Sequence, residues 1–409
     1  MTGTIDRTRA IKARDGLFAV FAINGFSFAT WMSRVPDMRD ALHLTPGQLS
    51  MLLLAVSLGA LTGLPLSGRI IDRIGAQKTV RLGVFLLAPG LVLAAAAITF
   101  GSSIYLVMPG LFLVGLGNGT WDVAQNFEGT LVERGVKRAI MPWFHAAFSG
   151  GTVLGALIGA AVVALRGSIL VHMAVVAAIT LGIVVWTTTG FLSHSGRPPA
   201  TSNDATTSPA VDRSSAWLEP RTLLIGLMVM AAAFTEGAAN DWMAVAFVEG
   251  HDIDNALGVV ALAVFLIFMT TGRVLGTRLL NSYGRVPVLR LMFVMAIAGC
   301  LLVVFGNTPL AFLGAAIWGV GASLGFPVGM SAAADDPARA PLRISVVSTI
   351  GYGAFLGGPP LLGFLGDQVG VLNALLLVGV ISVVALFIVP IAKEPDVVLL
   401  RAGRTSRDS

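Results

Sequence analysis

The chain has 409 residues, of which 55% are hydrophobic and only 12% are charged, and its mean hydropathy is +0.83. Soluble domains carry roughly a quarter charged residues, so this composition excludes an ordinary soluble domain. The formal charge of +5 would suit a nucleic-acid partner, but the cations lie in short loops between apolar runs. We therefore expect no nucleic acid among its partners and predict an integral membrane protein that is surrounded by a lipid bilayer.

Apolar runs of about 20 residues or more recur along the chain, which is the length that a helix needs to cross about 30 Å of hydrocarbon. The first run follows a basic leader, is too long for a signal-peptide core and is interpreted as a retained helix. Twelve transmembrane helices are predicted. They begin near Gly16, Gly47, Thr79, Ser103, Pro142 and Ser168, and again near Arg221, Asn255, Val286, Thr308, Leu342 and Gly370.

A stretch rich in Ser, Thr, Pro and Asp interrupts the apolar runs at mid-chain. It predicts a linker at residues 193–220 between a six-helix bundle at 1–192 and a second bundle at 221–394, with a tail at 395–409. A weak internal repeat supports the division, because Trp31-Met32 in the first half corresponds to Trp242-Met243 in the second. The predicted fold class is an all-α membrane protein made of two pseudo-symmetric six-helix bundles.

Lysine and arginine gather in alternate loops, in the leader, in the linker and in the tail. By the positive-inside rule these segments are cytoplasmic. We therefore expect a multi-pass protein of a bacterial inner membrane, with both termini in the cytoplasm, and we expect it to be a monomer. On the opposite side, Arg34 is expected to pair with Asp37 at the outer rim.

Three segments carry a family resemblance. Residues 68–78, GRIIDRIGAQK, lie between the second and third predicted spans and resemble the signature loop of the major facilitator superfamily. Residues 33–42, SRVPDMRDAL, and 121–126, WDVAQN, are similar to segments of a bacterial group related to fucose permeases and to a membrane protein of rhizopine gene clusters. The resemblance extends over essentially the whole chain.

The resemblance implies secondary transport by alternating access, in which two bundles rock around a site near the middle of the membrane. It also implies that Asp72 meets the positive N-terminal end of the eleventh span, near Pro341. We therefore expect Asp72 and Arg73 to take part in gating. Residues 148–155 lack the Gly-Pro step of the drug-antiporter signature, which makes multidrug export a less favoured expectation.

Polar side chains within the spans are the candidate site residues, because a charge at bilayer depth costs at least roughly 2.5–3.5 kcal/mol on insertion scales. In the fourth span, spacings of three and four place polar residues on one helix face around Asp122. Such a face can hydrogen-bond a hydroxylated solute while an indole stacks on its apolar side. The predicted substrate-binding residues are Asn24, Trp31, Asn118, Trp121, Asn126, Glu236, Asn240 and Trp242.

A carboxyl group in a poorly hydrated cavity can bind a proton on one side of the membrane and release it on the other. We predict that Asp122 or Glu236 does so, and the alternative is a permanently charged structural pair. Arg273 and Asp122 lie at similar depths, so we predict that they form a gating pair across the two halves. The alternative for Arg273 is that it extends to the membrane surface.

The sequence contains no Walker loop, metal-ligand cluster or nucleophile elbow, so we expect neither an enzyme, nor a cofactor, nor a metal site. The favoured function is proton-coupled uptake of a small polyhydroxylated solute such as a sugar or cyclitol, with the solute and protons as partners. One alternative is a proton-coupled exporter of amphiphilic or metabolic compounds. The other is a non-transporting solute sensor or lipid-handling protein on the same fold.

Overall fold

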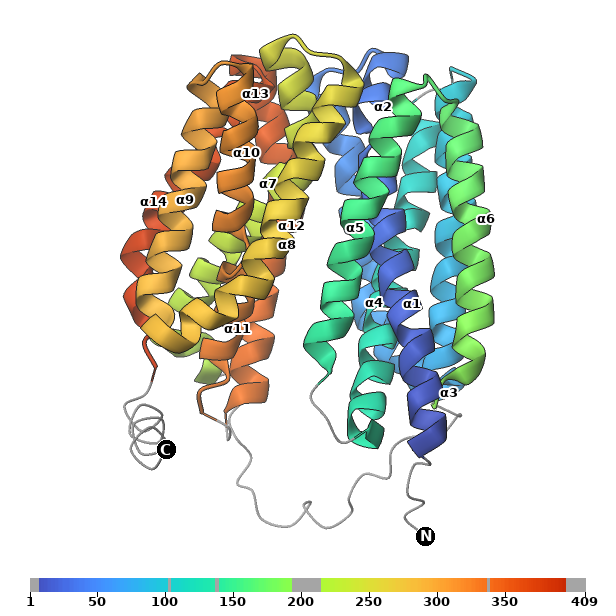
Figure 1. The fold of residues 1–409 in the computed structure, drawn as a ribbon, viewed down its shortest axis with the longest axis vertical. Coiled ribbons are helices and arrows are strands. Elements are labelled where there is room, and N and C mark those ends of the chain that lie inside the picture. The colour runs from blue at the N-terminus through green and yellow to red at the C-terminus, as the bar shows by residue number, and fades with distance from the viewer. Residues whose placement is uncertain (1–6, 102–103, 137–139, 193–214, 337–338, 395–409) are drawn as a thin grey trace. The chain divides into compact units, whose positions relative to one another are not determined.

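The computed structural model describes residues 7–101, 104–136, 140–192, 215–336 and 339–394. Most of the predicted linker at 193–220 and all of the predicted tail at 395–409 lie outside the described residues. Within the described residues every long element is a helix and none is a strand (Figure 1). The all-α prediction is confirmed.

The first half of the chain begins with α1 (Arg7–Met32), α2 (Val35–Leu42) and α3 (Pro46–Thr99). It continues with α4 (Ile104–Val136), α5 (Met141–Ala164), α6 (Ile169–Thr187) and the short η1 (Thr188–Gly190). The predicted second and third spans are one helical element, α3, which changes direction at Gly75, where φ is 83° and ψ is 160°. Glycine adopts this backbone conformation without the steric cost that a side chain would add.

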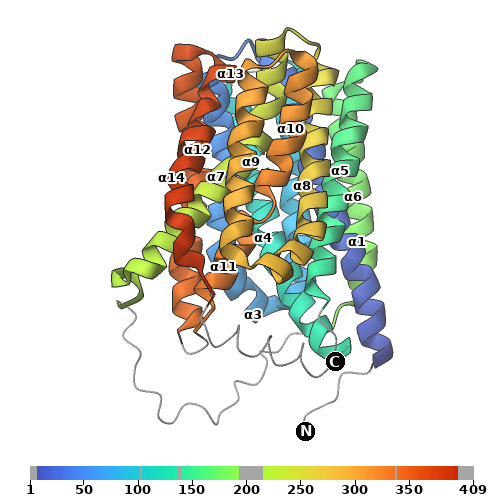
Figure 2. The same cartoon turned by 60° about the vertical axis from the view of Figure 1, so that its left-hand side comes forward.

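The second half comprises η2 (Ser215–Leu218), α7 (Pro220–His251), α8 (Asn255–Tyr283), α9 (Arg285–Phe305), α10 (Thr308–Ala322) and α11 (Gly325–Ala333). After these come α12 (Ala340–Val369), α13 (Val371–Ala374), α14 (Leu376–Ile388) and η3 (Val389–Ala392). The predicted tenth span is divided into α10 and α11. Figures 1 and 2 show α9 beside α10 and α14, against which it packs.

Ten helical segments in the described part of the chain are long and apolar enough to cross a membrane. Among them α3 counts once, although its 54 residues extend about 81 Å, enough for two passes of about 30 Å. The 30-residue helix α12 is not among the ten but is also long enough. With these two additions, every one of the twelve predicted spans corresponds to a helical segment.

The chain forms two compact units. The first comprises Met1–Ala205 with Met243–Ala263, and the second comprises Thr206–Trp242 with Val264–Ser409. The end of α7 and the start of α8 therefore group with the first unit, which a division at a mid-chain linker does not anticipate. The domain boundaries expected from the sequence stay predictions.

Within the first unit, helices approach closely at glycines. A Cβ atom on Gly25 would lie 2.1 Å from the carbonyl oxygen of Phe148, and one on Gly151 would lie 1.9 Å from that of Ala22. Both contacts join α1 to α5. Small residues at such crossings let helix backbones approach each other, which is how membrane helices gain packing energy without help from the hydrophobic effect.

The second unit has an apolar core that α7, α9, α11, α12 and α14 share. Its members include Met228, Leu289, Phe293, Val328 and Val347. At one end of this core, near η2, the carboxylate of Glu219 lies 2.6 Å from the guanidinium of Arg339 and 2.7 Å from that of Arg343. These ion pairs hold the start of α12 against the start of α7.

Glu219→Gln should remove a pH-dependent part of the stability. Burial by itself raises the pKa of Glu219, but hydrogen bonds from Thr222 and Arg343 and the charges of Arg343 and Arg339 outweigh it, so the pKa is lowered. The stabilisation is therefore present above the unfolded-state pKa of roughly 4.3 and is lost as the pH falls through the folded-state pKa. Thermal unfolding of the detergent-purified protein should lose less stability on acidification in the variant.

The matched control for that experiment is Asp252→Asn. Asp252 is exposed and makes no hydrogen bond or ion pair with the described residues. Its replacement should leave the pH profile of the unmodified protein unchanged. Parallel profiles for Glu219→Gln and the unmodified protein would contradict the role given to Glu219.

Candidate functional site

A polar face runs along α4 in the first unit. Asn118, Asp122 and Asn126 follow one another at intervals of four and are all half-buried. The Oδ1 atom of Asp122 accepts hydrogen bonds from the side-chain amides of Gln125 at 3.0 Å and Asn126 at 3.2 Å. Helical spacing alone brings these groups together. Asn118, Asp122 and Asn126 thus lie on one face of α4, as the sequence predicts.

Several buried polar atoms of this unit have no hydrogen-bond partner among the described residues. The amide nitrogen and oxygen of Asn24 on α1 have no hydrogen-bond partner, and Asn24 is only 1% exposed. The indole nitrogens of Trp31 and Trp121 also have none. On α4, the Oδ1 atom of Asn118 and the Oε1 atom of Gln125 likewise have no hydrogen-bond partner among the described residues. Leaving a buried polar group unpaired costs about 1–3 kcal/mol, so each such atom needs an explanation. α1 packs against α4, which brings the two sets to neighbouring helices.

His145 on α5 adds a titratable group to this region. Its ring lies edge-on to that of Phe21, with 5.4 Å between the centroids. Its charge also acts on the Asp122 carboxylate. A histidine can change charge near neutral pH, so Asp122 has a neighbour whose state depends on pH.

The second unit contains an ion pair between α7 and α8. The Nη2 atom of Arg273 lies 2.7 Å from the Oε2 atom of Glu236, and its Nε atom donates to the carbonyl oxygen of Ser323 at 3.3 Å. Arg273 therefore has a carboxylate partner within its own unit, to which the sequence argument did not assign it. The expected pair between Arg273 and Asp122 would join the two units and stays a prediction.

The middle of α7 is buried except at its polar residues. From residue 231 to residue 247, the side chains that keep partial exposure are Glu236, Asn240 and Asp241. Trp242 is 1% exposed, and its indole nitrogen has no partner among the described residues. The partial exposure of this stretch of α7 therefore falls on its polar residues, whereas a lipid-facing surface would expose apolar side chains. Asp241 is the member of this group that the sequence-based site did not include.

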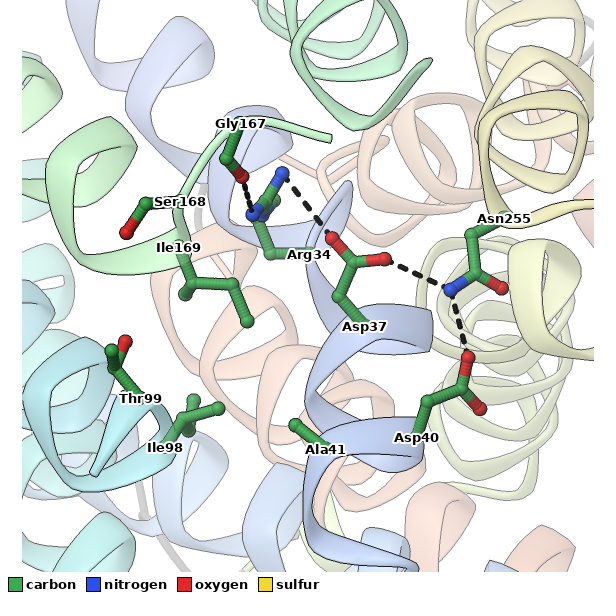
Figure 3. Close-up of a pocket in the computed structure, with 10 residues that line it drawn as sticks. All are labelled: Arg34, Asp37, Asp40, Ala41, Ile98, Thr99, Gly167, Ser168, Ile169 and Asn255. Carbon is green, nitrogen blue, oxygen red and sulfur yellow. Dashed lines mark hydrogen bonds and ion pairs between the residues drawn. The ribbon is translucent and has the colours of Figure 1, made fainter. Parts of the chain in front are cut away.

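A pocket of about 350 Å³ with charged side chains in its lining is found in the first unit, where α2 meets the start of α8 (Figure 3). The guanidinium of Arg34 lies 3.2 Å from Asp37 and donates to the carbonyl oxygen of Gly167 at 2.6 Å. The side-chain amide of Asn255 donates to Asp37 at 2.9 Å and to Asp40 at 2.8 Å. The expected pairing of Arg34 with Asp37 is confirmed. The hydrogen bonds of Asn255 to these two aspartates were not expected from the sequence.

Asp72 and Arg73 are exposed, three and two residues before the change of direction at Gly75. Neither makes a hydrogen bond or ion pair with the described residues. The expected contact between Asp72 and the start of α12 would join the two units, so the gating role of this segment stays a prediction. Within the described ranges, no group of His, Cys, Asp and Glu side chains is arranged to hold a metal ion.

Comparison with known proteins decides the family. The family model described as "Major Facilitator Superfamily" matches residues 17–305 and 253–404, which together cover most of the chain. The chain belongs to the major facilitator superfamily. It is therefore a multi-pass transporter that binds small-molecule substrates, and the proteins that it resembles are transporters rather than enzymes.

Relatives within the superfamily cover nearly the full length. The chain is 31% identical over 387 residues to "Uncharacterized transporter y4wD" of Sinorhizobium fredii, covering 93% of this chain and 98% of that protein. It is 26% identical over 371 residues to "Membrane protein MosC" of Rhizobium meliloti, covering 89% and 86%. The solved structure of the E. coli fucose:proton symporter FucP superposes with a TM-score of 0.64 at 16% identity, covering 93% of this chain and 98% of that one. The resemblance to fucose permeases and to the rhizopine-cluster protein is confirmed.

Proposed function

We propose that this superfamily transporter takes up a small, polar, polyhydroxylated solute, such as a sugar or cyclitol, together with protons and by alternating access. The observation that carries the proposal is the set of buried polar atoms without partners on α1 and α4. Asn24 offers an unpaired amide N–H and an unpaired carbonyl oxygen, while Trp31 and Trp121 offer indole N–H groups. Hydroxyl groups both donate and accept, so a polyol offers hydrogen-bond partners to donors and acceptors of both kinds.

The ionic state of the site also favours a neutral solute. Asp122 receives hydrogen bonds from two amides, and Glu236 is neutralised by Arg273. Asp122 and Glu236, the two carboxylates of the predicted site, are therefore already engaged and less suited to bind an organic cation, and an organic anion would compete with Glu236 for Arg273. Indole rings beside amides suit the alternating apolar and hydroxylated faces of a sugar ring.

The carrier is proposed to lie in a bacterial inner membrane as a monomer, with both termini in the cytoplasm. The positions of its basic residues support this orientation. Arg69, Arg73 and Lys78 lie close to the bend of α3 at Gly75, which is one end of the first unit. Asp37 and Asp40 lie at the opposite end of the first unit, where they line the pocket beside α2. Positive charge on the cytoplasmic side is the general rule for membrane proteins.

Uptake into proteoliposomes tests the proposal. A panel of hexoses, polyols and amino-cyclitols is screened for thermal stabilisation of the purified protein, since ligands of the native state stabilise it by mass action. Stabilising members are then assayed for flux with an inward proton gradient. We expect accumulation that collapses with a protonophore. Asn24→Ala should raise the half-saturation concentration about tenfold or more, because it removes hydrogen bonds from the solute.

The matched control is Asn373→Ala, at an exposed asparagine whose amide bonds to the carbonyl oxygen of Val369. This variant should transport normally. Stabilisation by lipophilic cations alone, with efflux driven by protons, would replace the proposal with the exporter alternative. Binding of a polyol without any flux would replace it with the sensor alternative.

A further inference from the structure

We infer that Asp241, on α7, is the carboxylate that carries the coupled proton. The inference rests on the proposed proton-coupled function and deepens it by naming a residue. It starts from the contacts of the carboxylates in the spanning helices. A proton carrier has to be stable in both its charged and its neutral form, so a carboxylate that a cation holds permanently charged is a poor carrier.

The two carboxylates expected from the sequence both have partners that stabilise their charged forms. Glu236 is bound to Arg273 at 2.7 Å. Asp122 accepts hydrogen bonds from Gln125 and Asn126, and the charge of His145 acts on it. Uptake of a proton by Glu236 would break its ion pair with Arg273, and uptake by Asp122 would disturb its hydrogen bonds with the two amides.

The other buried and half-buried carboxylates of the helices are also engaged. Glu128 accepts a hydrogen bond from the backbone N–H of Leu192, and Glu133 accepts from the backbone N–H groups that open α5. Glu249 is paired with Arg39. Of this class of carboxylate in the described residues, Asp241 alone makes no hydrogen bond and no ion pair.

The charged and titratable side chains around Asp241 do not supply a partner either. On α7, α8, α9 and α12, these side chains are Arg221, Glu236, Glu249, His251, Arg273, Arg278, Tyr283, Arg285, Arg290, Cys300, Arg343, Tyr352 and Asp367. None of these side chains makes a hydrogen bond or an ion pair with Asp241. No described cation therefore holds Asp241 in its charged form.

The Asp241 side chain nevertheless keeps partial exposure. It is one of the three half-exposed polar side chains in the otherwise buried middle of α7, next to the buried Trp242. A carboxylate in this position can exchange a proton while the space beside α7 is open to one side. When that space closes, the neutral acid is far cheaper to enclose than an unpaired carboxylate. Closure then selects the protonated form, which is the condition for coupling.

The weak internal repeat predicted from the sequence supports a role of this carboxylate outside the scaffold. Aligning Trp31-Met32 with Trp242-Met243 places Thr30 at the position of Asp241. The hydroxyl of Thr30 donates to the carbonyl oxygen of Phe26 within its own helix at 2.7 Å. The fold therefore accepts a locally satisfied neutral group at this position, and the acid in the second half is an addition that the scaffold does not require.

Carbodiimide labelling tests the inference without knowledge of the solute. Dicyclohexylcarbodiimide reacts with protonated carboxyl groups in apolar surroundings, and the modified residue is located by mass spectrometry of the full-length protein in membranes. We expect labelling at Asp241, stronger in mildly acidic than in mildly alkaline buffer, and little at Glu236. Labelling of Asp122 or Glu236 with none at Asp241 would overturn the assignment.

Flux measurements test the coupling. With the stabilising hexose or cyclitol of the panel, Asp241→Asn should keep solute exchange between the two sides but lose proton-driven accumulation and solute-dependent proton movement. Retained exchange shows that the variant is folded and binds solute. Asn has nearly the volume of Asp, so a packing defect is not the expected cause of the loss.

The outcomes distinguish the two levels of the proposal. Proton movement that persists in Asp241→Asn overturns the assignment of Asp241 and leaves proton-coupled uptake intact. Absence of solute-dependent proton movement in the unmodified protein overturns the proposed function and the inference together. Asp252→Asn is the matched control, because Asp252 is exposed and makes no hydrogen bond or ion pair with the described residues, and this variant should retain proton-driven accumulation.

Discussion

Reversing the charge of Arg273 alone, by Arg273→Glu, should abolish transport and destabilise the protein. Glu236 would then face a second carboxylate inside the second unit instead of a cation at 2.7 Å. Removing one partner of a fully buried pair costs about 3–5 kcal/mol. Here the side chains of Arg273 and Glu236 keep 30% and 20% exposure, so we expect a loss on the order of 2 kcal/mol. Thermal unfolding and solute uptake measure the two effects.

Two double reversals tell which carboxylate is the partner of Arg273. Glu236→Arg with Arg273→Glu restores opposite charges on α7 and α8 and should recover stability and part of the transport. Asp122→Arg with Arg273→Glu tests the pairing expected from the sequence across the two halves. Recovery in the second double variant and not in the first would contradict the pairing of Arg273 with Glu236 as the functional one.

Gly151→Ala should be among the most damaging single substitutions in the first unit. The added Cβ would lie 1.9 Å from the carbonyl oxygen of Ala22 and 2.8 Å from its carbonyl carbon. These are backbone atoms of α1, so no side-chain rotation can make room and the two helices have to separate. Overpacking costs about 1–3 kcal/mol or more, and here the entire α1–α5 contact is affected. The yield of monodisperse protein and the temperature of unfolding should both fall.

The neighbouring glycine supplies the control. A Cβ on Gly150 would have no atom within 4 Å. Gly150→Ala should therefore be neutral or slightly stabilising, since alanine is the better helix former by about 1 kcal/mol. Equal loss of stability in both variants would mean that the close approach of α1 and α5 does not limit the size of the residue at position 151.

Part of the candidate site follows from local spacing and was predictable. Residues four apart on a helix are neighbours, so Asp122 and Asn126 meet whatever the rest of the chain does. The pair formed by Arg34 and Asp37, three residues apart, belongs to the same class. Contacts between helices do not. Arg273 and Glu236 are 37 residues apart, and Asn255 lies more than two hundred residues from Asp37 and Asp40.

The sequence by itself determined that this protein is a helical membrane transporter with twelve spans. Lipid offers no hydrogen bonds, so a chain this apolar has to satisfy its backbone within each span, and only helices do so in sequence-local fashion. Only the tertiary structure decided that Glu236 is neutralised by Arg273, that Asn255 bridges two aspartates and that Asp241 has no partner. Those outcomes depend on which faces of different helices meet, and the packing that selects these faces is a property of the folded chain as a whole.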